Sequence, residues 1–180
     1  MKPPERFKRR VFPSWVPPVD GWRSIAHHEA GHVVAAECYG ITPHRAEVDL
    51  QGGCGHMLLR PLSVDSPACD EESGALGVFC LVGLTDTASA FEEMALRSAV
   101  ILMAGQQAEL VRACITPAGV LRMNDQDTRQ AAYLLRTILG TDVALAWAQL
   151  QARYLLAQHW VRVEAIASEL QAKGCWDHAE

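Results

Sequence analysis

The pentapeptide at residues 28–32, His-Glu-Ala-Gly-His, constrains this chain more than any other stretch of its sequence. On an α-helix, residues i and i+4 lie one above the other, so His28 and His32 can direct their imidazoles at one metal ion. Glu29 falls about 100° further round the helix, beside that point, where its carboxylate can accept a proton from water. The spacing H-E-x-x-H is therefore typical of a zinc hydrolase.

The residues around this motif favour a helix from Ser24 to Tyr39. Ser24 can cap its N-terminus, and Gly40 stands where a helix usually ends. Ile25 and residues 33–35 supply apolar surface, and an unpaired histidine pair would be costly to bury on so apolar a helix. The helix context thus supports a metal-binding role for the motif.

Composition defines the class of protein. The chain has 180 residues, of which 49% are apolar and 21% charged, as expected for one globular domain with a real core. The net charge of −5 gives no sign of nucleic-acid binding. No apolar run reaches the roughly 18 residues of a membrane span, and the N-terminus lacks an apolar signal core. We therefore expect a soluble, cytoplasmic protein whose six cysteines are free, buried thiols.

Two regions are expected along the chain. Residues 1–21 form a basic, proline-rich N-terminal arm, because residues 1–20 carry five of the 16 basic residues and five of the nine prolines. Such a density of proline prevents regular structure. Residues 22–180 form one domain, in which residues 75–84 are apolar enough for either a buried helix or a strand.

Alternating apolar and polar residues predict a β-hairpin directly after the motif helix. Residues 45–51 form the first strand, the glycine-rich residues 52–55 the turn, and residues 56–60 the returning strand. The edge of such a hairpin can pair with an extended substrate. His44 and His56 flank the hairpin and are expected at the surface.

Helical periodicity accounts for the remaining segments. Residues 91–103 predict a helix that is interrupted at Ala104-Gly105 and resumes over residues 106–114. A further helix is expected over residues 128–139, and a helical hairpin or one bent helix over residues 142–173. The apolar face of this last region is expected in the core, and it comprises Trp147, Leu150, Tyr154, Leu155, Trp160, Ile166 and Leu170.

Three blocks of sequence resemble, in the same order, peptidase family M41, the protease domain of the membrane-bound FtsH ATPases. Residues 24–36, Ser-Ile-Ala-His-His-Glu-Ala-Gly-His-Val-Val-Ala-Ala, look like the family's helix bearing H-E-A-G-H. Residues 101–109, Ile-Leu-Met-Ala-Gly-Gln-Gln-Ala-Glu, are similar to its helix ending in G-G-x-A-A-E. Residues 124–131, Asn-Asp-Gln-Asp-Thr-Arg-Gln-Ala, resemble its segment N-D-L-x-x-A, and the likeness spans residues 22–173.

The resemblance implies a mainly α (α+β) fold, a helical zinc-peptidase domain with a small β-hairpin after the H-E-x-x-H helix. It also implies Zn²⁺ as the metal, held by His28, His32 and a third residue from the N-D-L-x-x-A segment. The chain departs from the family in having no G-x-x-x-x-G-K-[ST] motif, no membrane anchor, and Leu110 in place of a second glutamate. A standalone domain without the ATPase module is therefore expected.

A hydrolytic zinc site needs three protein ligands, so a third residue must join His28 and His32. The candidates are Asp127, Asp125 and Glu109. Matching Ala131 to the family's alanine places the ligand at Asp127. Matching the Asn-Asp pair instead places it at Asp125 and puts Arg129 on a buried face, so we prefer Asp127. Asp125 then becomes a helix N-cap.

Two neighbouring residues are expected to have supporting roles. Glu109 lies on a predicted helix and could orient a ligand histidine rather than bind the metal itself. His27 lies one residue off the ligand face and is expected to be structural.

We expect a zinc-dependent, ATP-independent metallo-endopeptidase that hydrolyses peptide bonds in unstructured proteins or peptides. It could act alone, as a homo-oligomer, or with a separate unfoldase. The alternative is a proteolytically inactive M41-like binding or regulatory module that retains the metal site. The presence of Glu29 favours the enzyme, because an inactive member would be expected to lose its general base. A third hypothesis, that the protein binds nucleic acid, would depend on the basic residues 1–20 alone.

Overall fold

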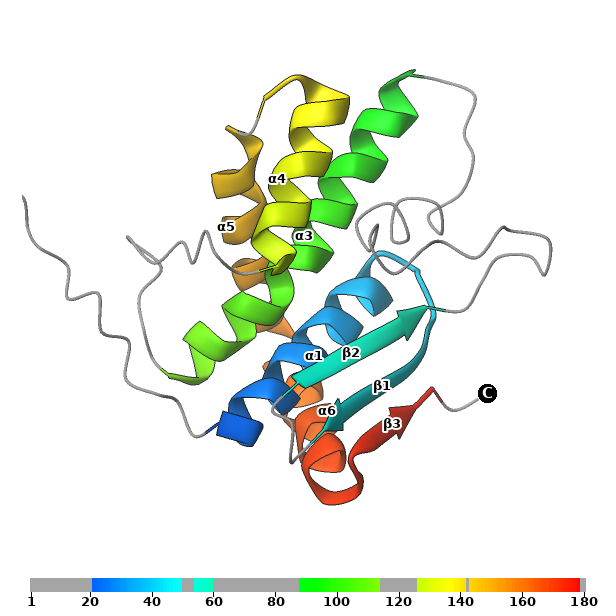
Figure 1. Cartoon of the computed structure of the whole chain (residues 1–180), viewed down its shortest axis with the longest axis vertical. Helices are drawn as coiled ribbons and strands as arrows, with labels where there is room; N and C mark the ends of the chain where they lie inside the picture. Colours follow the sequence, from blue (N-terminus) through cyan, green and yellow to red (C-terminus); the bar gives the residue numbers. More distant parts are fainter. Residues whose placement is uncertain (1–20, 50–53, 60–87, 114–125, 142, 179–180) are drawn as a thin grey trace, which may run out of the picture.

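A computed structural model describes residues 21–49, 54–59, 88–113, 126–141 and 143–178 of the chain. Within these residues the protein has five helices and one small antiparallel sheet, as Figure 1 shows. The prediction of a mainly α fold with a hairpin after the H-E-x-x-H helix is confirmed. The elements are α1 (Gly21–Cys38), β1 (Pro43–Asp49), β2 (Cys54–Leu59), α3 (Ala88–Arg112), α4 (Gln126–Leu139), α5 (Ala144–Gln158), α6 (Trp160–Lys173) and β3 (Cys175–Asp177).

The helix that carries the motif lies at the centre of this arrangement. Helix α1 packs against α3, α6 and both strands of the hairpin. Its residues from Ala30 to Ala36 are fully or almost fully buried. The prediction of a helix around the motif is confirmed, and α1 begins at Gly21, a residue that the sequence pattern assigns to the N-terminal arm.

The sheet has the strand order β2-β1-β3, and both pairings are antiparallel. Strand β1 buries Ala46 and Val48 against α1, as the alternating pattern predicts. Cys54 and Gly55, which are expected in the turn from the sequence, belong to β2 and pair with β1. The three-residue strand β3 was not predicted, because a segment this short cannot show an alternating pattern.

Helix α3 runs without a break from Ala88 to Arg112, so the predicted interruption at Ala104-Gly105 is wrong. Glycine inside a helix costs about 1 kcal/mol relative to alanine, which is why it suggested a break. Here the glycine has a packing role instead. A Cβ atom at Gly105 would lie 2.5 Å from the rings of His28 and His32 on α1.

The C-terminal region consists of two helices, α5 and α6, which meet at His159. Part of its predicted core face is wrong, because Trp147, Leu150 and Tyr154 are exposed. Helix α5 packs on α3 with another face, formed by the smaller side chains. The buried residues of α5 are Leu145, Ala148, Ala152 and Leu156.

No helix in the described part of the chain is long and apolar enough to cross a membrane. Three predictions fall outside the described residues: the N-terminal arm over residues 1–20, the apolar segment 75–84, and the side chain of Asp125.

The close contact between α1 and α3 predicts an unusual effect of Gly31→Ala. A Cβ at Gly31 would lie 2.6 Å from the carbonyl oxygen of Ala104 and 2.8 Å from the Cβ of Ala108. We expect the substitution to lower the free energy of unfolding by about 1–3 kcal/mol through overpacking, although alanine is the better helix former. Urea denaturation in the presence of a chelator measures this effect separately from metal binding.

Thr137→Ala, at an exposed position of α4, is the control and should change stability by less than about 0.5 kcal/mol. If Gly31→Ala were as stable as the wild type, the packing of α1 against α3 would not depend on this glycine.

Candidate metal centre

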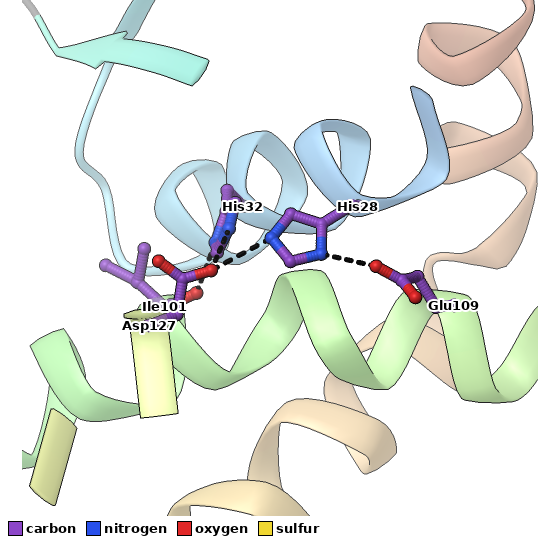
Figure 2. Close-up of polar contacts among 5 residues, drawn as sticks. All are labelled: His28, His32, Ile101, Glu109 and Asp127. Atoms are coloured by element: carbon purple, nitrogen blue, oxygen red, sulfur yellow. Dashed lines mark hydrogen bonds and ion pairs between the residues drawn. The ribbon is translucent and has the colours of Figure 1, made fainter. Parts of the chain in front are cut away.

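His28 and His32 present the same ring atom toward one point. The Nδ1–H of His28 donates a hydrogen bond to Oε1 of Glu109 at 2.7 Å, and the Nδ1–H of His32 donates to the carbonyl oxygen of Ile101 at 2.7 Å (Figure 2). Both acceptors come from α3. Since each Nδ1 is engaged, the two Nε2 atoms are the ones available to a metal, and the rings are held in place from behind.

Asp127, in the first turn of α4, completes a group of three. Its Oδ2 lies 2.9 Å from Nε2 of His28 and 3.3 Å from Nε2 of His32. Tetrahedral zinc, with bonds of about 2.1 Å, holds its ligand atoms roughly 3.4 Å apart. The two separations that involve Asp127 are therefore close to the spacing that zinc requires, and all three donor atoms lie within 4.8 Å of one another. Among the described residues, they form the group that could hold a metal ion.

Gly105 leaves space at this point. A Cβ atom at this position would lie 2.5 Å from the Nε2 atoms of both His28 and His32. A zinc ion would lie about 2.0–2.1 Å from each of the same atoms. The methyl group of an alanine would therefore compete for the volume that a metal ion needs. The donor set, two imidazoles and one carboxylate, is also one that zinc accepts, so the residues present fit this metal.

The charges of the group favour a cation. Burial raises the pKa of Asp127, but His32 and His28 outweigh it and hold that pKa well below the ordinary value, so the carboxylate is ionised. Burial lowers the pKa of both imidazoles, but the acidic neighbours together outweigh it and raise both pKa values. At His28 these neighbours are Asp127, Glu109 and Glu29, and at His32 they are Asp127 and Glu29. The Nε2 atoms thus attract a positive charge, and a metal ion would displace their protons.

Glu29 is buried between α1 and the hairpin. A Cβ at Gly55 of β2 would lie 2.7 Å from both Cγ and Oε1 of Glu29, so the strand backbone lies directly against this carboxylate. Burial raises the pKa of Glu29, although His32 and His28 lower it, and His56 on β2 contributes in the same lowering direction. A carboxyl group whose pKa is raised toward neutrality is suited to accept and return a proton.

The alternative ligand Glu109 lies elsewhere. It contacts the Nδ1 side of His28, whereas Asp127 contacts the Nε2 side, as Figure 2 shows. Glu109 therefore occupies the position of a residue that orients His28. Asp125 lies outside the described residues, so its proposed role as a helix cap stays a prediction. Arg129 is exposed on α4, as the register based on Asp127 requires.

The other histidines of the sequence analysis lie away from this group. His27 is buried, stacks on Trp160 of α6 at 6.0 Å between ring centroids, and places Nε2 3.3 Å from Glu164. His56 is exposed and lies 3.3 Å from Glu47 on β1. His44 is exposed at the start of β1.

Sequence reasoning missed Gly105 and Gly55, which lie against the imidazoles and the carboxylate. In both cases glycine was interpreted as a break or a turn. No sequence signal distinguishes a glycine that ends an element from one that allows a close approach. The carbonyl of Ile101 was missed too, because backbone groups leave no trace in a motif.

Comparison with known proteins leaves the resemblance without further support. No protein-family model matches the chain, and no curated protein matches it. Any proposal for the function of this protein therefore rests on the geometry of His28, His32, Asp127 and Glu29.

The space at Gly105 predicts that Gly105→Ala abolishes stoichiometric zinc binding. We expect zinc affinity to fall by more than about 100-fold, beyond the 10- to 100-fold loss usual for a residue that supports a ligand. Competition with a chromogenic chelator measures the affinity, and circular dichroism checks that the protein is folded. Ser98→Ala is a matched control, because Ser98 is buried on the same helix and its hydroxyl has no partner among the described residues. Full zinc occupancy in Gly105→Ala would show that the metal lies elsewhere.

A second prediction separates the candidate third ligands. Asp127→Ala should lower zinc affinity by orders of magnitude, because it removes one of three donors. Glu109→Gln should weaken binding by about 10- to 100-fold. Asp125→Ala should retain zinc and lose about 1 kcal/mol of stability, the usual value of an N-cap. The same chelator competition and urea denaturation measure all three variants. Loss of zinc in Asp125→Ala but not in Asp127→Ala would make Asp125 the third ligand, and unchanged zinc affinity in both variants would make Glu109 the leading one.

Proposed function

We propose that this protein is a zinc-dependent, ATP-independent metallo-endopeptidase similar to peptidase family M41, acting on unstructured proteins or peptides. One observation carries the proposal. The Nε2 atoms of His28 and His32 and Oδ2 of Asp127 converge on one point, and the carboxylate of Glu29 comes from the same helix, adjacent to His28. Donors for a metal and a buried base with a raised pKa are thus combined in one small volume.

Hydrolysis of a peptide bond would use the metal ion and Glu29 in different roles. Zinc held by these donors would supply a Lewis acid that polarises a peptide carbonyl and makes water more acidic. Glu29 accepts a proton from the attacking water as the new C–O bond forms. It then returns that proton to the amine nitrogen as the C–N bond breaks, so no external proton source is needed. Glu109 and the carbonyl of Ile101 keep the imidazoles oriented throughout.

The position of β2 supports a peptide as the substrate. In the described sheet β2 is an edge strand, paired only with β1, and its Gly55 lies against Glu29. An extended peptide could pair with this edge through its backbone, which would bring a scissile bond beside the base. Backbone pairing tolerates many side-chain sequences but requires an extended chain. This is why we propose unstructured substrates rather than folded ones.

The proposal predicts that Glu29→Gln retains zinc and fold but loses hydrolysis, because an amide cannot accept the proton. We expect the rate to fall by about 10²- to 10⁴-fold or more. A library of quenched fluorescent peptides, digested by zinc-loaded protein and analysed by mass spectrometry, measures cleavage. Glu92→Gln, at an exposed position of α3, is the matched control and should cleave like the wild type.

Two results would contradict the proposal in different ways. Equal cleavage by the wild type and Glu29→Gln would refute the assigned base. A zinc-loaded wild type that cleaves no peptide of the library would instead favour the binding or regulatory module that retains the metal site.

A further inference from the structure

A row of large apolar side chains lies exposed along α5. It consists of Val143, directly before the helix, and Trp147, Leu150 and Tyr154, which we call the α5 stripe; these side chains are between 43 and 79% exposed. Tyr133 of the neighbouring helix α4 is also exposed, at 60%. Single exposed apolar residues are ordinary, but four large apolar side chains in one row along a helix indicate an interaction surface.

Helix α5 is apolar on two opposite faces. One face, with Leu145, Ala148, Ala152 and Leu156, is buried, and α5 packs on α3. At about 100° per residue, the α5 stripe points to the opposite side of the helix. Arg153 is the one charged residue among the 15 of α5. Apolar faces on opposite sides of a helix are normally both covered, so a partner is expected on the outer face.

The spacing of the stripe points to a second copy of this chain. Its residues are separated by four, three and four positions, the repeat that forms a seam between two helices. This order is the same when read backwards. Two antiparallel α5 helices related by a two-fold axis would place Val143 opposite Tyr154, and Trp147 opposite Leu150. The stripe is therefore complementary to itself. Helix α5 has no acidic residues, so nothing on it indicates a basic partner.

The available area is sufficient for such a pairing. A whole aromatic side chain has about 200 Å² of surface, so the α5 stripe and Tyr133 together expose roughly 600 Å² in each copy. The α5 stripe alone would bury about 1,000 Å² between two copies, the area that a biological interface should reach. Helix α5 packs chiefly on α3, whereas the hairpin strand β2 packs on β1 and α1, so the stripe and the hairpin edge belong to different parts of the fold.

We propose that the α5 stripe is the interface of a two-fold symmetric homodimer with antiparallel α5 helices. Sedimentation velocity of the zinc-loaded full chain over a concentration series tests this. We expect twice the mass of one chain at high concentration. Leu150→Glu and Trp147→Lys should each raise the dimer Kd by at least about 30-fold, as for hot-spot residues. Val161→Glu is a matched control, because Val161 is 85% exposed but lies in α6, outside the stripe, and its Kd should stay within about threefold.

Mixing variants tests the antiparallel register. In this pairing Leu150→Glu of one copy faces Trp147→Lys of the other, so a mixture of the two variants should form a heterodimer that neither variant forms alone. Circular dichroism and zinc content verify that both are folded. If either variant is misfolded, Tyr154→Glu and Val143→Lys provide the same opposed pair.

Three results would overturn the proposal. The first is a wild type that stays monomeric up to about 1 mM, since a specific dimer binds more tightly than that. The second is a dimer that Leu150→Glu leaves intact, which would place the interface on another surface. The third is variants that dissociate the dimer but give no heterodimer on mixing, which would exclude the antiparallel pairing.

Discussion

The close approach of α1 and α3 is the constraint on which the proposed site depends. Gly31 of α1 allows contact with Ala104 and Ala108 of α3, and Gly105 of α3 makes room for the rings of His28 and His32. At this short distance α3 can supply both hydrogen-bond acceptors that orient the imidazoles. With a larger side chain at either glycine, the two helices could not keep this separation, and the rings would lose their supports.

A second constraint is electrostatic. Two imidazoles and three carboxyl groups, from α1, α3 and α4, meet in a largely buried volume. Burying an ionised carboxylate is costly unless a positive charge compensates it. The imidazoles of His28 and His32 provide that compensation to Asp127, and zinc would supply it more strongly. The same charges keep the pKa of Glu29 from rising as far as burial alone would raise it. The proposed base and the proposed metal donors thus depend on each other.

The sequence predicted those parts of the fold that local patterns specify. The motif helix, the hairpin and α4 follow from hydrophobic periodicities of 3.6 and 2 residues. The motif, together with the match of Ala131 to the family's alanine, is enough to propose the group of His28, His32 and Asp127. The continuity of α3 through Gly105 could not be predicted, because it depends on contacts with residues more than 70 positions away. The prediction that Trp147 lies in the core is wrong for a related reason. Periodicity shows that a helix face is apolar, but it does not show what covers that face.

Glycine explains why a short motif is insufficient to predict such a site. The side chains of the H-E-x-x-H helix need room on two sides: Gly105 on α3 gives the imidazoles space for a metal, and Gly55 on β2 lets a strand lie against Glu29. Each glycine looks like a helix break or a turn when read locally. A chain could keep the motif and lose the site through one added methyl group at either position. A metal centre of this kind therefore requires close backbone approach from two other elements as well as the two histidines and the glutamate.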